Sequence, residues 1–190
     1  MQKTAHILGT DHTYQRNDDS CEPDAIKAFL KYLRTLCNAH GIKAIGEEMS
    51  VSALNAHDRA ESIPAKFASR NKITHRYCDP SPEEQQAMGI VEGPAVRLRM
   101  RDQHFSEEQV NQLIWKEDLK REPYWLTKIQ EWEKERDIWP LLFICGSCHV
   151  ISFSQRLTTI AITVHVAHHN WVPKTPLNRT RGKRGASHRA

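Results

Sequence analysis

Residues 140–146 read PLLFICG, a continuous apolar run that ends in glycine. Such a run is typical of a central strand of a parallel sheet, because helices cover both of its faces. A second apolar run, AHILG at residues 5–9, also ends in glycine. Apolar and β-branched residues predict shorter strands at 42–46, 73–78 and 162–167.

Helix signals lie between these strands. Pro23 begins a segment whose apolar residues recur at helical spacing, and Gly41 is its expected end. Ser81 and Ser106 each begin a further helix, because a Glu or Gln three residues later completes a capping box. Another short helix is predicted near 154–161. Strands that alternate with helices predict an α/β fold with a mainly parallel sheet flanked by helices.

Charge divides the chain into two parts. The 190 residues suit one domain with its own core, and their formal net charge is +4. Residues 174–190 carry six Lys or Arg residues and no acid, so the rest of the chain has a formal charge of −2. We therefore predict an α/β domain over residues 1–172 and a basic, disordered tail over residues 173–190. Such a tail can bind nucleic acid, although a solubilising role is favoured.

The sequence also predicts the cellular compartment of the protein. No apolar run approaches the roughly 18 residues of a membrane helix, and the first residues lack the pattern of a signal peptide. The chain is therefore expected to be cytoplasmic and not membrane-bound. There its five cysteines are expected to be mainly reduced thiols, and their odd number argues against a fully paired disulfide framework.

Two of the predicted strands end in the same pattern, Gly-x-x-His. One pattern runs from Gly9 to His12, and the other runs from Gly146 to His149. In parallel sheets, ligands bind beyond the carboxyl ends of the strands, where glycine permits a sharp turn. We therefore expect both imidazoles at one edge of the sheet. The polar stretch 11–20 is expected to be a loop.

Acidic residues follow two other predicted strands. Glu47 and Glu48 follow the second strand, and Asp79 follows the third. Two imidazoles and one carboxylate can hold a divalent metal with an open position for water, so manganese, cobalt or zinc is expected. The predicted ligands are His12, His149 and Glu47, which is preferred slightly to Glu48. Without a metal, the same groups can act as general acid and base.

At these residues the chain resembles the TraB/TIKI group, which belongs to a superfamily with the erythromycin esterases and the ChaN-like haem-binding proteins. The resemblance spans roughly residues 5–172 and rests on ILGTDH, IGEE, REPYWLTKI and LLFICGSCHV. The paired Gly-x-x-His motifs match His12 and His149. The acidic position after the second strand matches one of the two adjacent glutamates, and the Arg-x-x-x-Trp segment matches Arg121 and Trp125.

The resemblance implies a hydrolase that acts on an ester or amide bond of a small molecule or peptide. The TIKI members are metal-dependent peptidases, and the esterase members use a histidine base. Glu47, Glu48 and Arg121 are then candidate catalytic residues, and the guanidinium could hold a substrate carboxylate or a developing oxyanion. This chain departs from the pattern at Cys148, where a small residue is usual. Further candidates for the site are Asp11, Asp79 and Glu122.

The alternative to a hydrolase is a non-catalytic protein on the same scaffold. Such a protein would bind haem, a metal or a nucleotide, or would sense redox state. Residues 145–149 spell Cys-x-x-Cys-His, the pattern of c-type haem attachment, which requires export. The same cysteines could form a redox pair, although the usual neighbouring residues are missing. A structural zinc site would need more ligands, from His165 in a predicted strand or from His168 and His169 in a predicted loop.

Overall fold

The computed structural model describes residues 2–16, 18–19, 21–101 and 103–174. Its centre is a five-stranded sheet with the order β3-β2-β4-β1-β5, and each neighbouring pair of strands is parallel. The α/β fold expected from the sequence is therefore confirmed, with a sheet that is parallel throughout. The strands are β1 (Thr4–Thr10), β2 (Ala44–Glu47), β3 (Thr74–Tyr77), β4 (Leu141–Gly146) and β5 (Thr163–Trp171).

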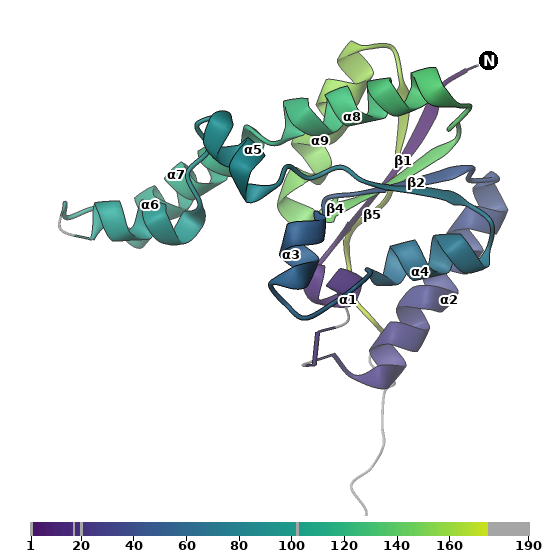
Figure 1. The fold of residues 1–190 in the computed structure, drawn as a ribbon, viewed down its shortest axis with the longest axis horizontal. Coiled ribbons are helices and arrows are strands. Elements are labelled where there is room, and N and C mark those ends of the chain that lie inside the picture. Colours follow the sequence, from purple (N-terminus) through teal and green to yellow (C-terminus); the bar gives the residue numbers. More distant parts are fainter. Residues whose placement is uncertain (1, 17, 20, 102, 175–190) are drawn as a thin grey trace, which may run out of the picture.

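Helices cover both faces of the sheet (Figure 1). One face packs against α2 (Pro23–His40) and α4 (Ile63–Arg70), and the other packs against α8 (Glu122–Glu135) and α9 (Val150–Thr159). Figure 1 shows α5, α6 and α7 extending to one side of the sheet. The remaining elements are α1 (His12–Arg16), α3 (Val51–Asn55), α5 (Pro82–Ala87), α6 (Gly93–Met100), α7 (Glu107–Leu119) and a 3-10 turn, η1 (Ser147–His149).

The side chains of β4 alternate between two cores. Leu141, Phe143 and Cys145 belong to the core beneath α8 and α9. Leu142 and Ile144 belong to the core beneath α2 and α4. Successive residues of a strand point to opposite faces, so an uninterrupted apolar run fills both cores at once. Each residue of β4 is buried, as predicted for a central strand.

The predicted helix ends are also confirmed. Gly41 follows α2 with a left-handed φ of 59°, and its N–H donates to the carbonyl of Cys37. A side chain would strain this conformation, which explains why glycine ends the helix there. Ser81 and Ser106 form reciprocal capping boxes at the starts of α5 and α7.

Two local predictions were wrong, and one helix was not predicted. The stretch 11–20, expected to be a loop, contains α1, because Asp11 Oδ1 accepts the N–H of Thr13 at 2.8 Å and so supports a short first turn. The last strand is longer than predicted and includes His168 and His169. These two residues are exposed on an edge strand, so their polarity did not reveal the strand. Helix α6 was not predicted, because its apolar residues form no clear stripe.

Some expectations concern the ends and the cysteines of the chain. From residue 175 onward, the predicted basic tail lies outside the described residues. None of the helices in the described ranges combines the length and apolar character that a membrane crossing requires. All five cysteines are free thiols; Cys145 is buried in β4, and Cys148 is exposed.

Candidate functional site

The candidate site is built around the carboxylate of Glu48, which directly follows β2 and is 2% exposed. Its Oε2 accepts the backbone N–H of Gly146 at 2.7 Å. Its Oε1 accepts a hydrogen bond from Arg121 Nη2, also at 2.7 Å. The Nε2 atoms of His12 and His149 lie 3.5 and 3.6 Å from this same Oε1. The structure therefore brings both Gly-x-x-His imidazoles to one carboxylate oxygen at the carboxyl edge of the sheet.

The neighbouring Glu47 lies on the opposite face of the sheet. Its Oε1 accepts a hydrogen bond from Ser62 Oγ and lies 2.6 Å from His75 Nε2. Adjacent residues at the end of a strand point in opposite directions, so the two glutamates cannot reach the same site. The slight preference for Glu47 as metal ligand and catalytic residue is therefore corrected, because Glu48 is the glutamate that the structure places beside both histidines.

Arg121 sits between two buried carboxylates. Its Nη1 donates to both oxygens of Asp79, at 3.2 and 3.0 Å, while its Nη2 donates to Glu48. Trp125 Nε1–H donates to Asp79 Oδ1 at 2.8 Å and so holds that carboxylate in place. The Arg121 side chain is only 16% exposed. It was expected to bind a substrate carboxylate or a developing oxyanion, but both of its terminal nitrogens, Nη1 and Nη2, already hold Asp79 and Glu48.

His149 is held from its other side by Glu122. The His149 Nδ1 atom lies 2.9 Å from Glu122 Oε1. The Glu122 carboxylate also accepts from Ser152 Oγ at 2.5 Å and from Arg156 Nε at 2.7 Å. Trp125 packs edge-on against the imidazole, with the ring centroids 4.8 Å apart. These contacts fix the ring orientation, so Nε2 faces Glu48.

Electrostatic interactions favour an ionised Glu48 beside protonated histidines. Burial disfavours the charge on Glu48, but His12 and Arg121 outweigh it and hold the pKa of this carboxyl well below its usual range. Burial also lowers the pKa of His12, but the charge of Glu48 reverses the shift and raises it overall. Burial and the negative charge of Glu48 raise the pKa of Asp79 to about 6, although Arg121 opposes this shift.

The protonation of His149 predicts a pH dependence of stability. Burial alone would lower its pKa, but hydrogen bonds to Cys148 and Glu122 raise it from 6.5 to about 10. The folded state therefore keeps a proton that the unfolded state loses. The stabilisation that comes from this bound proton is fully present below pH 6.5 and is lost as the pH rises to about 10. The free energy of unfolding should fall by up to about 1.4 kcal/mol per pH unit across this window.

Urea unfolding between pH 6 and 9.5 measures this slope. The His149→Gln variant should lack most of it, whereas His57→Gln, which changes an exposed histidine, should keep it. An equal slope in the wild type and in His149→Gln would contradict the assignment of the proton to His149.

Several contacts at the site were not predicted from the sequence. Asp118 Oδ1 lies 3.7 Å from Arg121 Nη2, and Ser152 and Arg156 hold Glu122. Helical spacing could have found them: Asp118 precedes Arg121 by three residues, and Ser152 and Arg156 follow His149 by three and seven. The further candidate Asp11 is exposed and caps α1 through Thr13 instead.

The arrangement fits a divalent metal poorly. No group of three or more His, Cys, Asp or Glu side chains in the described part of the chain is placed to hold a metal ion. Arg121 Nη2 lies 2.7 Å from Glu48 Oε1 and 3.4 Å from His149 Nε2. A divalent ion between these donors would lie against a fixed guanidinium, and two positive charges that close repel strongly. The guanidinium of Arg121 therefore supplies, next to Glu48, the positive charge that a metal ion was expected to supply.

Comparison with protein-family models, curated proteins and solved structures found no match for this chain. The resemblance to the TraB/TIKI group therefore stays a prediction from sequence motifs. Any function has to be argued from the geometry of the site itself.

Proposed function

We propose that this chain is a hydrolase of ester or amide bonds in which His12 acts as general base. The observation that carries the proposal is a difference in exposure. The side chains of Glu48 and His149 are each 1% exposed, whereas that of His12 is 34% exposed. Among the two imidazoles and the carboxylate that meet there, His12 is the group that a substrate can reach.

The chemistry follows from this placement. The His12 Nε2 atom takes a proton from a water molecule, whose oxygen attacks the carbonyl carbon of the substrate. The 3.5 Å between Nε2 and Glu48 Oε1 is too long for a strong hydrogen bond. In the neutral imidazole, which forms above the raised pKa of His12, the nitrogen lone pair can therefore accept a proton. The negative charge of Glu48 then stabilises the imidazolium. His12 finally returns the proton to the leaving oxygen or nitrogen.

Arg121 and His149 are positioning residues in this proposal. Both place a donor or a positive charge near Glu48 Oε1 and so keep that carboxylate ionised. Glu122 supports His149 in turn. The choice of an ester or amide bond rests on the resemblance to the TraB/TIKI group, and a small molecule or a peptide is the expected substrate.

A metal-dependent form of the proposal places a manganese, cobalt or zinc ion on His12, His149 and Glu48. It requires Arg121 to withdraw from Glu48, because its guanidinium occupies that carboxylate. We favour the metal-free form for this reason.

Hydrolysis assays with elemental analysis test the proposal. The purified protein would be incubated with p-nitrophenyl esters and peptide p-nitroanilides, with and without EDTA. We expect turnover that EDTA leaves unchanged, in protein without stoichiometric metal. Turnover that requires an added metal would support the metal-dependent form. Failure to hydrolyse either substrate class, with or without metal, would contradict both forms. A visible absorption band on haem addition that His149→Ala removes would favour a haem-binding protein instead.

A further inference from the structure

We propose that the groove between α2 and α4 binds the phosphate group of a phosphorylated small molecule through Arg34, Lys66 and Arg70. The groove has a volume of about 320 Å³. The three cationic side chains line it together with the apolar residues Leu30 and Phe67. Arg34 and Leu30 come from α2, whereas the other three come from α4. None of these residues belongs to the Glu48 site, so the proposal is independent of the proposed hydrolase activity.

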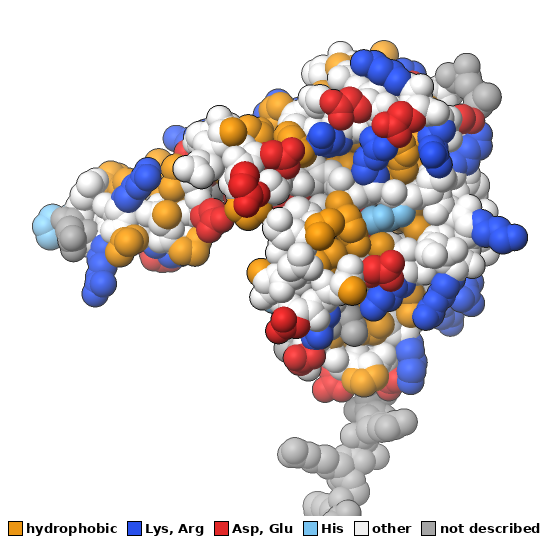
Figure 2. All heavy atoms as spheres, viewed as in Figure 1, with side chains coloured by type: hydrophobic (Ala, Val, Ile, Leu, Met, Phe, Trp, Pro, Cys, Tyr) orange, Lys and Arg blue, Asp and Glu red, His pale blue; other side chains and the backbone are white. Residues whose placement is uncertain are grey.

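The positive charge of this groove is not balanced locally. Residues 25–46 and 62–78, which contain nearly all of α2 and all of α4, include no Asp or Glu. Among the described residues, neither Arg34 nor the two cations of α4 has an ion-pair partner. This contrasts with the rest of the chain before residue 174, which is net acidic. Figure 2 shows Lys and Arg side chains gathered over α4 and α2.

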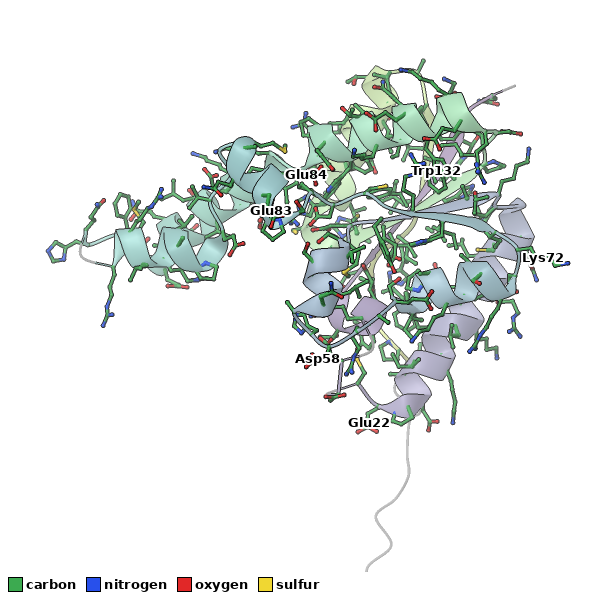
Figure 3. All side chains as sticks on the ribbon, viewed as in Figure 1. Glu22, Asp58, Lys72, Glu83, Glu84 and Trp132 are labelled. Carbon is green, nitrogen blue, oxygen red and sulfur yellow. The ribbon has the colours of Figure 1, made fainter. Side chains whose placement is uncertain are left out.

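The cations of this groove are exposed to solvent and line it from both helices. Lys66 and Arg70 are four residues apart on α4, so two like charges are neighbours on one helix face. Arg34 adds a third positive charge from the facing helix. Lys72 follows the end of α4 and points outward from the molecule (Figure 3). An anion in the groove would relieve this repulsion and would be attracted by the combined field.

The chemistry of the groove favours a phosphate attached to an apolar group. Two guanidinium groups can each donate two parallel hydrogen bonds to phosphate oxygens, and a lysine adds a compact charge. Leu30 and Phe67 offer apolar surface to the remainder of the ligand. A volume of about 320 Å³ is near the lower limit for small-molecule sites, roughly 300 Å³, and so favours a mononucleotide-sized ligand over a macromolecule.

Isothermal titration calorimetry with adenosine monophosphate, inorganic pyrophosphate and adenosine tests this assignment. We expect saturable one-site binding of the two phosphorylated probes and no binding of adenosine. The double variant Arg34→Ala/Arg70→Ala should weaken binding by at least about tenfold, because it removes the bidentate donors. The matched control Arg99→Ala/Arg101→Ala removes the same charge from α6 and the residue after it, and should change affinity less than about twofold.

Three results would overturn the proposal. The first is no saturable binding of either phosphorylated probe at millimolar concentration. The second is equal weakening by the two double variants, because binding would then reflect the overall charge of the protein. The third is tighter, steeply salt-dependent binding of a single-stranded oligonucleotide that Arg34→Ala/Arg70→Ala abolishes, because the groove would then serve a nucleic acid. Urea unfolding of both double variants would show that each is folded at the temperature of the titrations.

Discussion

Replacing Arg121 with alanine is expected to lower the free energy of unfolding by about 3–5 kcal/mol. The Arg121 side chain is 16% exposed, and its partners Glu48 and Asp79 are 1% and 8% exposed. Removal of the guanidinium leaves two buried carboxylates without their shared cation. Protonation of Asp79, whose pKa is already raised to about 6, offsets only part of this cost. Urea unfolding at pH 7 measures the difference from the wild type.

The exposed ion pair of Arg97 with Glu107 provides the matched control for this experiment. Their side chains are 48% and 74% exposed, so the pair is screened by water. Arg97→Ala should therefore cost less than about 1 kcal/mol. If Arg121→Ala were no more destabilising than Arg97→Ala, the buried network around Glu48 would not exist as described.

Replacing His12 with glutamine is expected to reduce kcat/KM for ester or amide hydrolysis by about 10²–10⁴-fold, the usual contribution of a general base. Glutamine keeps a polar group of similar size but cannot accept the proton. Because the His12 side chain is 34% exposed, the change should leave the fold intact. Steady-state hydrolysis of the best ester or peptide substrate measures the effect.

His75→Gln is the matched control for His12→Gln. His75 is also an imidazole beside a buried glutamate, but its partner is Glu47, on the other face of the sheet. This variant should keep kcat/KM within a fewfold of the wild type. A His12→Gln enzyme as active as His75→Gln would remove His12 from the mechanism.

The sequence predicts the fold well because the deciding signals are local. The apolar run of β4, the glycine that ends α2 and the serines that begin α5 and α7 each depend only on neighbouring residues. The edge strand β5 was predicted too short, because strand residues that face solvent need not be apolar. Helix α6 carries little apolar periodicity and for that reason gave no signal.

The site was predicted only in part, because its details depend on contacts between distant segments. The motifs identified His12 and His149, and the structure brings both to one carboxylate. The choice between the glutamates depended on which residue ends β2. The strand was predicted to end at residue 46, so both glutamates were expected to lie beyond it. It ends at Glu47, whose side chain faces α4, and Glu48 is therefore the glutamate left at the edge of the sheet.

Arg121 shows the same limit of sequence reasoning. Its motif was recognised, but its partners Asp79 and Glu48 lie 42 and 73 residues away in the chain. Their burial beside the guanidinium cannot be seen from spacing. For this reason the sequence suggested a cluster of metal ligands. In the described structure, the positive charge beside Glu48 is the guanidinium of Arg121.

The adjacent glutamates allow the most direct test of the central claim, because they differ by one position in the chain and by the face of the sheet on which they lie. The measurement is the hydrolysis rate of Glu48→Gln and of Glu47→Gln, each corrected for the folded fraction at the assay temperature. We predict that Glu48→Gln loses about 10²-fold or more, because the carboxylate that stabilises the His12 imidazolium is gone, while Glu47→Gln stays within a fewfold of the wild type. Equal losses in the two variants, or a greater loss in Glu47→Gln, would contradict the account.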